Sequence, residues 1–436
     1  AILPVIRPLG ETEDDSGYFD LAAPEEMDLA MPIGGVARLL ELGRLILAWR
    51  NRLPQVVIDI HSDSPLVAPA SPADAIWLAR SLAELIDSVE TEERDWADLG
   101  NLDTADHALW WQLTAEFLSI ASAFWPARLE ELRRSSPARH QAALLRGEAR
   151  RIAQREHKGP VIVAGSTGSV PAAADLIAVI SSLPQGSVVL PGLDLDMPDD
   201  QWATISAEGL DGRIDPSSRS HPQFGLSRLL GKLGVDRREV EALGSLAPDL
   251  DLRAKTLSQA LIPATATDQW SRWRQEVDRQ ALQEAFADVA LIEAANEREE
   301  AVAIAIALRL ALETPRADGR ESQAALITPD RTLARRVTAE LARFGITADD
   351  TAGTPLSATP QGTLVQLLLE ATLRPGDPVA ITSLLKHPLV RLGMDREQLR
   401  EAAEALEILA LRGGRGDMDI SALEPLLHEQ RAAQTT

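Results

Sequence analysis

Residues 159–194, GPVIVAGSTGSVPAAADLIAVISSLPQGSVVLPGLD, carry the pattern that decides the fold of this chain. The run GPVIVAG is apolar, rich in β-branched residues and bounded by glycine, which predicts a buried strand. The residues 166–183 predict a loop and a helix, and GSVVLPGLD at 186–194 predicts a second strand. A strand, a helix and a strand in this order form a parallel βαβ unit, so the sequence predicts an α/β fold.

The sequence on either side of this unit extends the same fold class. DVALIEAAN at 288–296 and AALITPD at 324–330 read as two more strands, each followed by a helical pattern, so we expect a second α/β unit to begin near residue 286. Helical spacing of apolar residues dominates before residue 155 and again beyond residue 350. One stripe in the first region is aromatic, is closed by Pro126, and is interpreted as core: Trp110, Leu113, Phe117, Ile120, Phe124 and Trp125.

Composition excludes several classes of protein. The 436 residues contain no cysteine, which excludes disulfides, zinc–thiolate sites, iron–sulfur clusters and cysteine nucleophiles within this chain and fits a cytoplasmic location. No apolar run is long enough to cross a bilayer, so we expect no membrane partner. The net charge is −23, with an acidic segment at 11–28, so any DNA contact requires a local basic path or a partner subunit.

The loop that follows the first predicted strand is the natural place for a nucleotide. A phosphate loop of the form GxxxxGK[ST] is absent, and the loop Gly165-Ser166-Thr167-Gly168-Ser169 has no lysine, although its position before a helix leaves anion binding open. A hydrolytic ATPase also needs a carboxylate at the end of this strand to hold Mg²⁺ and orient water. Gly165, Ser166 and Thr167 supply none.

Three other groups of polar residues are candidates for a site. The aspartates of PGLDLDMPDD at 191–200 fail the spacing of a calcium loop and are interpreted as a solvated loop. The seven histidines match no catalytic motif, and His221 and His387, each before a proline, are interpreted as structural. Arg331 and Arg335 lie one turn apart on a predicted helix, where either a phosphate contact or a solvated helix face is consistent with the pattern.

Several strings, taken together and in order, resemble one known family. They are residues 160–194 and the strings SHPQFGLSRLLGKLG, LIEAANEREEAVAIAIALR, ALITPDRTLARRVTAELARFGITADDTAGTPLSATPQG and LLKHPLVRLG. Over essentially the whole chain, this sequence resembles the AddB subunit of bacterial AddAB-type helicase–nucleases in its alphaproteobacterial form, and it resembles the central part of that subunit.

The resemblance implies a superfamily 1 helicase-like fold in which RecA-like parallel-sheet domains carry large helical insertions. It implies a heterodimer with an AddA-like helicase–nuclease subunit that processes DNA double-strand ends for homologous recombination and guides single-stranded DNA. ATP and Mg²⁺ would belong to that partner motor, and an iron–sulfur cluster to a nuclease domain outside this sequence. The implied layout is 1–24 as the opening of the first RecA-like domain, 25–155 as a helical insertion, 156–285 as the rest of that domain, 286–350 as the start of a second RecA-like domain, and 351–436 as a further helical insertion.

The same resemblance implies a degenerate nucleotide site. An active helicase of this superfamily would have its acidic pair at Gly165 and Ser166, followed here by Thr167, which also has no carboxylate. Its γ-phosphate arginine would fall near Pro329, although a one-residue shift could recruit Arg331. We therefore expect an ATPase-inactive scaffold with no catalytic residue, cofactor or metal of its own. Two alternatives stay open: an active ATP-dependent helicase with its phosphate loop upstream of this sequence, and a protein-interaction module for the motor subunit that contacts no DNA.

Overall fold

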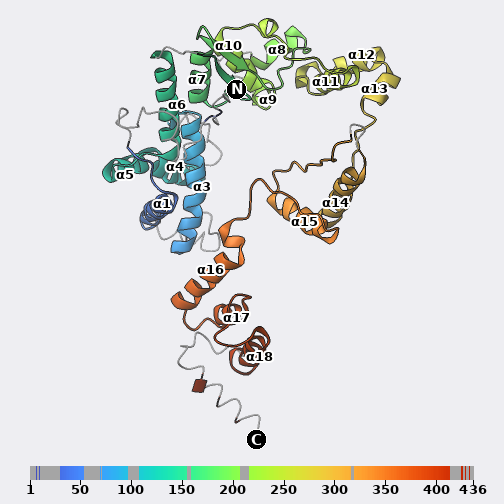
Figure 1. Ribbon diagram of the computed structural model, residues 1–436. Coiled ribbons are helices and arrows are strands. Elements are labelled where there is room, and N and C mark those ends of the chain that lie inside the picture. Colours follow the sequence, from blue (N-terminus) through green and yellow to red (C-terminus); the bar gives the residue numbers. More distant parts are fainter. Residues whose placement is uncertain are drawn as a thin grey trace. The chain divides into compact units, whose positions relative to one another are not determined.

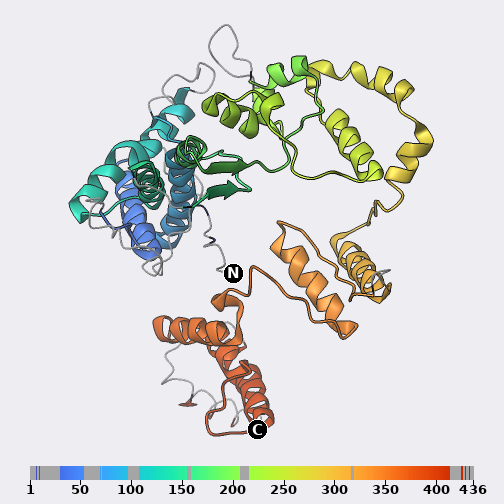
Figure 2. The ribbon, with the colours of Figure 1, turned by 45° about the horizontal axis from the view of Figure 1, so that its top comes forward.

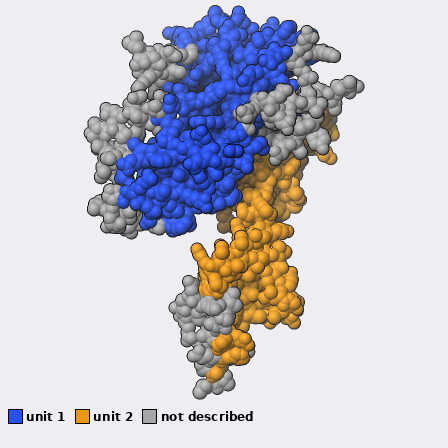
Figure 3. Space-filling model, turned by 90° about the vertical axis from the view of Figure 1, so that its left-hand side faces the viewer, with its two compact units in different colours: residues 1–290 blue, residues 291–436 orange. Residues whose placement is uncertain are grey.

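The computed structural model describes residues 30–53, 71–96, 108–154, 159–206, 216–315 and 319–412, together with a few isolated residues elsewhere. The acidic segment 11–28 and nearly all of the predicted domain opening at 1–24 lie outside the described residues. The chain divides into two compact units, residues 1–290 and 291–436 (Figure 3). The described part is mostly helical and contains one two-stranded parallel sheet (Figure 1). None of its helices combines the length and apolar character that a membrane crossing requires.

The first unit begins with a helical core. Helices α1 (Gly35–Arg50) and α3 (Pro72–Thr91) pack against each other. Ser71 begins α3 with a capping box, in which its hydroxyl accepts from the Asp74 amide and the Asp74 carboxylate accepts from the Ser71 amide. The apolar faces of these helices form one buried core together with side chains from the predicted aromatic stripe. The core includes Leu42, Ile46, Leu82, Ile86, Ile120 and Trp125.

Pro126 does not close the aromatic stripe, contrary to the prediction. Helix α4 (Ala108–Ser119) continues through a π-helical turn at Ile120–Phe124 into α5 (Trp125–Leu132), with the Trp125 amide donating to the carbonyl of Ile120. Proline has no amide and clashes with the carbonyl four residues before it, and the wider turn accommodates both effects. The extra residue also rotates the face: Trp125 is fully buried as predicted, whereas Phe124 is exposed. The side chain of Trp110 lies outside the description.

The predicted βαβ unit is present. Helix α6 (Pro137–Gln154) precedes β1 (Val161–Ala164), α7 (Pro171–Ser181) crosses over, and β2 (Gly186–Val189) pairs with β1 in parallel (Figure 2). The register joins Val161 to Gly186 and Ala164 to Val189. Apolar residues of α6, α7 and β1 pack into one core that includes Ile152, Val163 and Ile177. This core fixes the relative positions of α6 and α7.

The rest of the first unit is helical. Its elements are α8 (Asp199–Ser206), α9 (Pro216–Arg219), α10 (Phe224–Leu233), a 3₁₀ turn at Arg237–Glu239, α11 (Pro248–Ala260), a 3₁₀ turn at Ala264–Ala266, α12 (Gln269–Glu276) and α13 (Arg279–Ala285). Helix α10 packs against α7 and α8 and contributes Leu229 to the core beneath the sheet.

The second unit is also helical. Helices α14 (Glu297–Glu313) and α15 (Arg331–Arg343) pack through Ala301, Ala305, Val337 and Leu341. A 3₁₀ turn at Leu356–Ala358, α16 (Pro360–Leu373), α17 (Pro378–Lys386), α18 (Arg396–Leu406) and a π turn at Glu407–Leu411 follow, in keeping with the predicted helical character beyond residue 350.

The predicted strands at 288–296 and 324–330 are not strands. Both segments connect helices without joining any sheet among the described residues. Leu291 and Ile327 are 87% and 95% exposed. A strand is stabilised by hydrogen bonds to a neighbouring strand and by burial of at least one face. Neither segment has a partner strand among the described residues, and only 324–330 buries part of one face, where Leu326 packs against the core between α14 and α15. The α/β class is therefore realised as a helical protein with one small parallel sheet.

Candidate anion-binding groove and the loop after β1

The loop after β1 is held by its own backbone and by α10. Gly165 has φ of +79° and donates its amide to the carbonyl of Val189 at 3.1 Å. Gly168 has φ of +61° and donates its amide to the Ser166 hydroxyl at 3.2 Å. A Cβ on Gly168 would lie 2.8 Å from Leu229 Cδ1, and Thr167 lies against Gly225 in α10. The loop is thus a packed connection.

This loop offers few groups that could bind a phosphate. Helix α7 begins without a side-chain cap after Val170, and Pro171 in its first turn has no amide, so one of the donors that a phosphate uses at a helix N-terminus is missing. The α7 carboxylate, Asp175, is bound by Arg146 and Lys232. Gly165, Ser166 and Thr167 come together in this loop, but with neither the lysine nor the carboxylate of a working nucleotide site.

The other predicted positions belong to the second unit. Pro329 is an exposed bend residue just before Asp330, whose carboxylate caps α15 by accepting from the amides of Thr332 and Leu333. Arg331 donates two hydrogen bonds to the Asp350 carboxylate, at 3.0 and 2.6 Å, and a third to the Gly353 carbonyl at 3.3 Å.

Arg331 and Arg335 therefore differ in what they contact. The hydrogen bonds from Arg331 hold the pKa of Asp350 below its usual value. Arg335 is exposed and donates only to the backbone carbonyl of Arg331, at 3.3 Å. Of the two arginines predicted to contact phosphate, only Arg335 has a guanidinium without a carboxylate partner in the described part of the chain.

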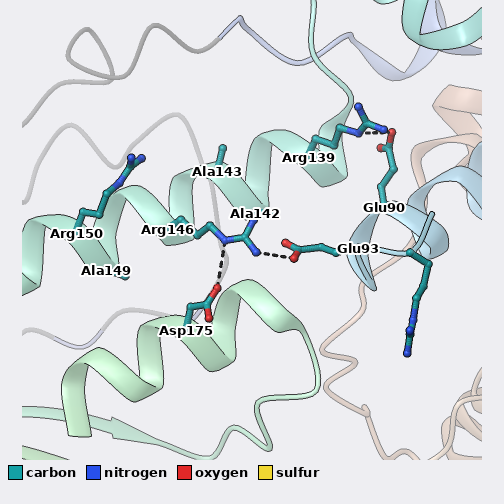
Figure 4. A pocket seen from close by; sticks show the side chains of 10 residues that line it. Glu90, Glu93, Arg139, Ala142, Ala143, Arg146, Ala149, Arg150 and Asp175 are labelled. Carbon is teal, nitrogen blue, oxygen red and sulfur yellow. Dashed lines mark hydrogen bonds and ion pairs between the residues drawn. The ribbon is translucent and has the colours of Figure 1, made fainter. Parts of the chain in front are cut away.

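A different place in the first unit collects arginines. A cavity of about 650 Å³ opens between α3, α6 and α7 (Figure 4). Four arginines and three carboxylates line it, with small residues between them: Glu90, Glu93, Arg94, Arg139, Ala142, Ala143, Arg146, Ala149, Arg150 and Asp175. We call these ten residues the arginine groove.

One end of the groove is anchored by a buried carboxylate. The Glu90 side chain is 5% exposed; it accepts a hydrogen bond from the Ser136 hydroxyl and pairs with Arg139 Nε at 2.9 Å. Burial raises the pKa of Glu90, against the opposing effects of Ser136 and Arg139. Arg139 itself remains 60% exposed. Its guanidinium has five N–H donors, so several stay available to a ligand.

The middle of the groove is a network across three helices. Arg146 donates to Glu93 at 2.5 Å and to Asp175 at 3.2 Å, as Figure 4 shows. Burial alone would raise the pKa of Asp175, but hydrogen bonds from Lys232 and Arg146 outweigh it, and the pKa lies below its usual value. The hydrogen bonds thus hold the Arg146 side chain in a fixed position between Glu93 and Asp175.

Two of the four arginines have no such partner. Arg94 follows the C-terminus of α3 and Arg150 lies near the end of α6; both are exposed, and neither forms an ion pair with any described residue. Figure 4 shows Arg150 at the opposite end of α6 from Arg139 and pointing away from Asp175. The groove therefore presents uncompensated positive charge in a chain whose net charge is −23.

The sequence contains a signal for this groove that is not part of any motif named above. Arg139, Arg146 and Arg150 are spaced by seven and four residues, which places them on one face of a helix. Alanines at 142, 143 and 149 lie on the same face and leave room around them. What the spacing could not show is that Glu90, Glu93 and Asp175 engage two of the four lining arginines.

The remaining predicted groups have structural roles. Asp194 accepts from the amides of Asp196 and Met197, at 3.0 and 2.9 Å, and Asp199 pairs with Arg237 at 2.7 Å, which fits the interpretation of this segment as a loop. His221 Nε2 lies 2.6 Å from the Leu261 carbonyl oxygen, and His387 Nδ1 accepts from the Leu389 amide at 3.3 Å. No group of three or more potential metal ligands occurs within the described ranges.

Comparisons with known proteins give no relative. No protein-family model, no curated protein and no solved structure matches this chain.

Proposed function

We propose that this chain is a helicase-like, ATPase-inactive scaffold within an AddB-type subunit of an ATP-dependent helicase–nuclease that processes DNA double-strand breaks for homologous recombination. Its sheet and helices would belong to RecA-like domains with large helical insertions. The observation that carries the proposal is the β1–α7–β2 unit, which has a parallel crossover of the kind found in nucleotide-binding domains, while its loop at 165–169 has neither the lysine nor the carboxylate of a working nucleotide site.

The contacts around the degenerate positions support the inactive state. A working site requires a carboxylate after β1 to hold Mg²⁺ and an arginine that is free to approach the γ-phosphate. Gly165 to Thr167 have no carboxylate, Pro329 has no charge, and Arg331, the substitute nearby, donates to Asp350 with both terminal nitrogens. Restoring ATP chemistry would need a new acid and the loss of that ion pair.

In this proposal the ATP-driven motor lies in a partner subunit. An AddA-type subunit would bind ATP and Mg²⁺ and translocate the DNA. This chain would hold the complex together and guide a single DNA strand in the cytoplasm. The uncompensated arginines of the arginine groove give such a strand a local contact, which an acidic protein needs.

The test is ATP-dependent degradation of linear duplex DNA by the intact AddB-type subunit co-expressed with its AddA-type partner. We expect activity to vanish when the partner's phosphate-loop lysine is replaced. ATP-driven unwinding that persists with that lesion would show a motor in this subunit and refute the proposal. A direct measurement on this chain complements it: with Mg²⁺ and ATP, we expect no hydrolysis above the rate without protein.

A further inference from the structure

We propose that the arginine groove between α3, α6 and α7 binds the phosphodiester backbone of a single nucleic-acid strand, with Arg94, Arg139 and Arg150 contacting different phosphates of that strand. This assignment rests on the proposed function for the presence of a strand, and on the geometry of the groove for its location.

The charges of the groove select an anion. Arg94 and Arg150 have no carboxylate partner among the described residues, and Arg139, which contacts Glu90 through Nε at 2.9 Å, keeps 60% of its side chain exposed to a ligand. Arg146 is fixed by Glu93 and Asp175 and keeps the floor of the groove rigid.

The shape of the groove selects a strand over a single phosphate. Arg139 and Arg150 stand eleven residues apart on α6, which corresponds to about 16 Å along the helix axis. One phosphate cannot reach both ends, whereas a polymer with regularly repeated phosphates can. The cavity volume of about 650 Å³ lies within the range of about 300–1,000 Å³ that holds small ligands. That space suits a short length of one strand.

The lining selects the backbone over the bases. The groove has no aromatic side chain, and its apolar residues are all alanines. Sequence-tolerant binding of bases relies on stacking against aromatic rings, which this groove lacks. Contacts to phosphates carry no sequence information, so we expect binding that is independent of base sequence and sensitive to salt.

The first experiment compares two charge-matched double variants of this chain. R94Q/R150Q removes the unpaired arginines of the groove, and R272Q/R274Q removes two exposed arginines of α12 that do not line it. Binding of fluorescein-labelled (dT)₂₀ is followed by anisotropy between 20 and 200 mM NaCl, a range chosen because phosphate contacts depend on salt.

We expect R94Q/R150Q to bind about tenfold more weakly at the lowest salt, while R272Q/R274Q stays within about twofold of the wild type. The slope of log K against log[salt] should become shallower by about 1.4 in the groove variant, because two phosphate contacts of a single strand are lost. Equal weakening in both variants, or no binding by the wild type at 20 mM NaCl, would overturn the proposal.

The second experiment locates the strand without changing charge. The chain has no cysteine, so A143C in the groove and A254C on the exposed side of α11 each provide a single labelling site. We expect (dT)₂₀ to slow alkylation of A143C severalfold and to leave A254C unaffected. Equal rates with and without (dT)₂₀ at A143C would refute the groove even if the arginine variants misfold.

Competitors separate the chemical sources of the anion. We expect an unlabelled (dA)₂₀ strand to displace (dT)₂₀, and polyglutamate or inorganic phosphate at equal total charge to fail. Displacement by polyglutamate would show an acidic-peptide site and overturn the assignment to nucleic acid. None of these measurements uses ATP or the partner subunit. If the groove does not bind (dT)₂₀, the proposed function is unaffected. If the nuclease assay refutes the proposed function, the binding and alkylation results still decide whether the groove binds nucleic acid.

Discussion

Gly186 begins β2 at a point where its backbone passes so close to the end of α7 that no side chain fits. A Cβ at this position would lie 1.8 Å from the carbonyl oxygen of Ile180 and 3.1 Å from Leu183 Cβ, whereas real Cβ atoms essentially never come within 3.0 Å of another atom. Ile180 belongs to the core that holds the sheet against α6 and α7. Gly186→Ala must therefore push two backbone segments apart by roughly 1 Å in a well-packed region.

The size and sign of the effect follow from these contacts. Overpacking costs about 1–3 kcal/mol, and we expect the upper part of that range because the opposing atom is a backbone oxygen that no rotamer change can move. Gly231→Ala is the matched control. Gly231 lies inside α10, is exposed, and has no atom within 4 Å of a built Cβ. There, alanine should stabilise the helix by about 0.5–1 kcal/mol.

The assay is urea unfolding followed by tryptophan fluorescence. All nine tryptophans precede residue 290, so the signal reports the first unit alone. We expect the midpoint of Gly186→Ala to fall by about 1 M and that of Gly231→Ala to rise, with unchanged slopes. A midpoint for Gly186→Ala at or above that of the wild type would show that α7 and β2 do not approach each other in this way.

Three further predictions concern the same unit and the same assay. Ser71→Ala removes the hydroxyl of the α3 capping box and should lower the free energy of unfolding by about 1 kcal/mol, and an equal loss in Ser88→Ala, whose exposed hydroxyl bonds only within the helix, would argue against a capping effect. Trp125→Ala should cost about 3–5 kcal/mol, while Trp125→Phe should cost much less because the buried indole nitrogen has no hydrogen-bond partner to lose; similar losses in both would contradict this. Burial raises the pKa of Glu90, so its contribution to stability is complete below the usual value of 4.5 and is lost as pH rises through the folded-state pKa. Glu90→Gln should remove that decline, and parallel pH profiles of the urea midpoint for wild type and variant would refute it.

Local pattern predicted the elements of the first unit well where neighbours in the sequence are also neighbours in space. The β1–α7–β2 unit is one such case, since its strands pair directly across a short crossover. Phe124 is a case where the pattern failed. Its helical spacing predicts a buried ring, but the π turn before Trp125 and Pro126 inserts one residue and rotates the face. Proline in a helix signals a break, but the sequence does not show whether the chain bends, stops or widens there.

The two wrong strands, 288–296 and 324–330, fail for another reason. Neither segment is helical, but neither is a strand. A strand, however, exists only with a partner, and partnership is a property of the whole fold. Leu291 and Ile327 have the apolar side chains typical of a strand, but because their segments have no partner strand among the described residues, these side chains are exposed to solvent.

The ion pairs of the arginine groove could not be predicted from the sequence either. The sequence gives the spacing of Arg139, Arg146 and Arg150, but the carboxylates that neutralise the first two come from residues 29 to 53 positions away. Two arginines that look alike in the sequence thus end as a fixed structural ion, Arg146, and a free cation, Arg150. The same distinction separates Arg331 from Arg335 in the second unit.

The net negative charge of the chain and the arginines of the groove act on DNA over different distances. The −23 charge repels a strand over the whole surface, but salt screens this repulsion beyond about 10 Å at 0.1 M, whereas an arginine in contact with a phosphate is much less screened. The observed salt dependence is the sum of the two, so the slope for the wild type alone does not count contacts. R94Q/R150Q and R272Q/R274Q each replace two arginines by neutral glutamine and take the net charge from −23 to −25. Because their long-range repulsion is the same, the difference between their slopes isolates the contacts made in the groove.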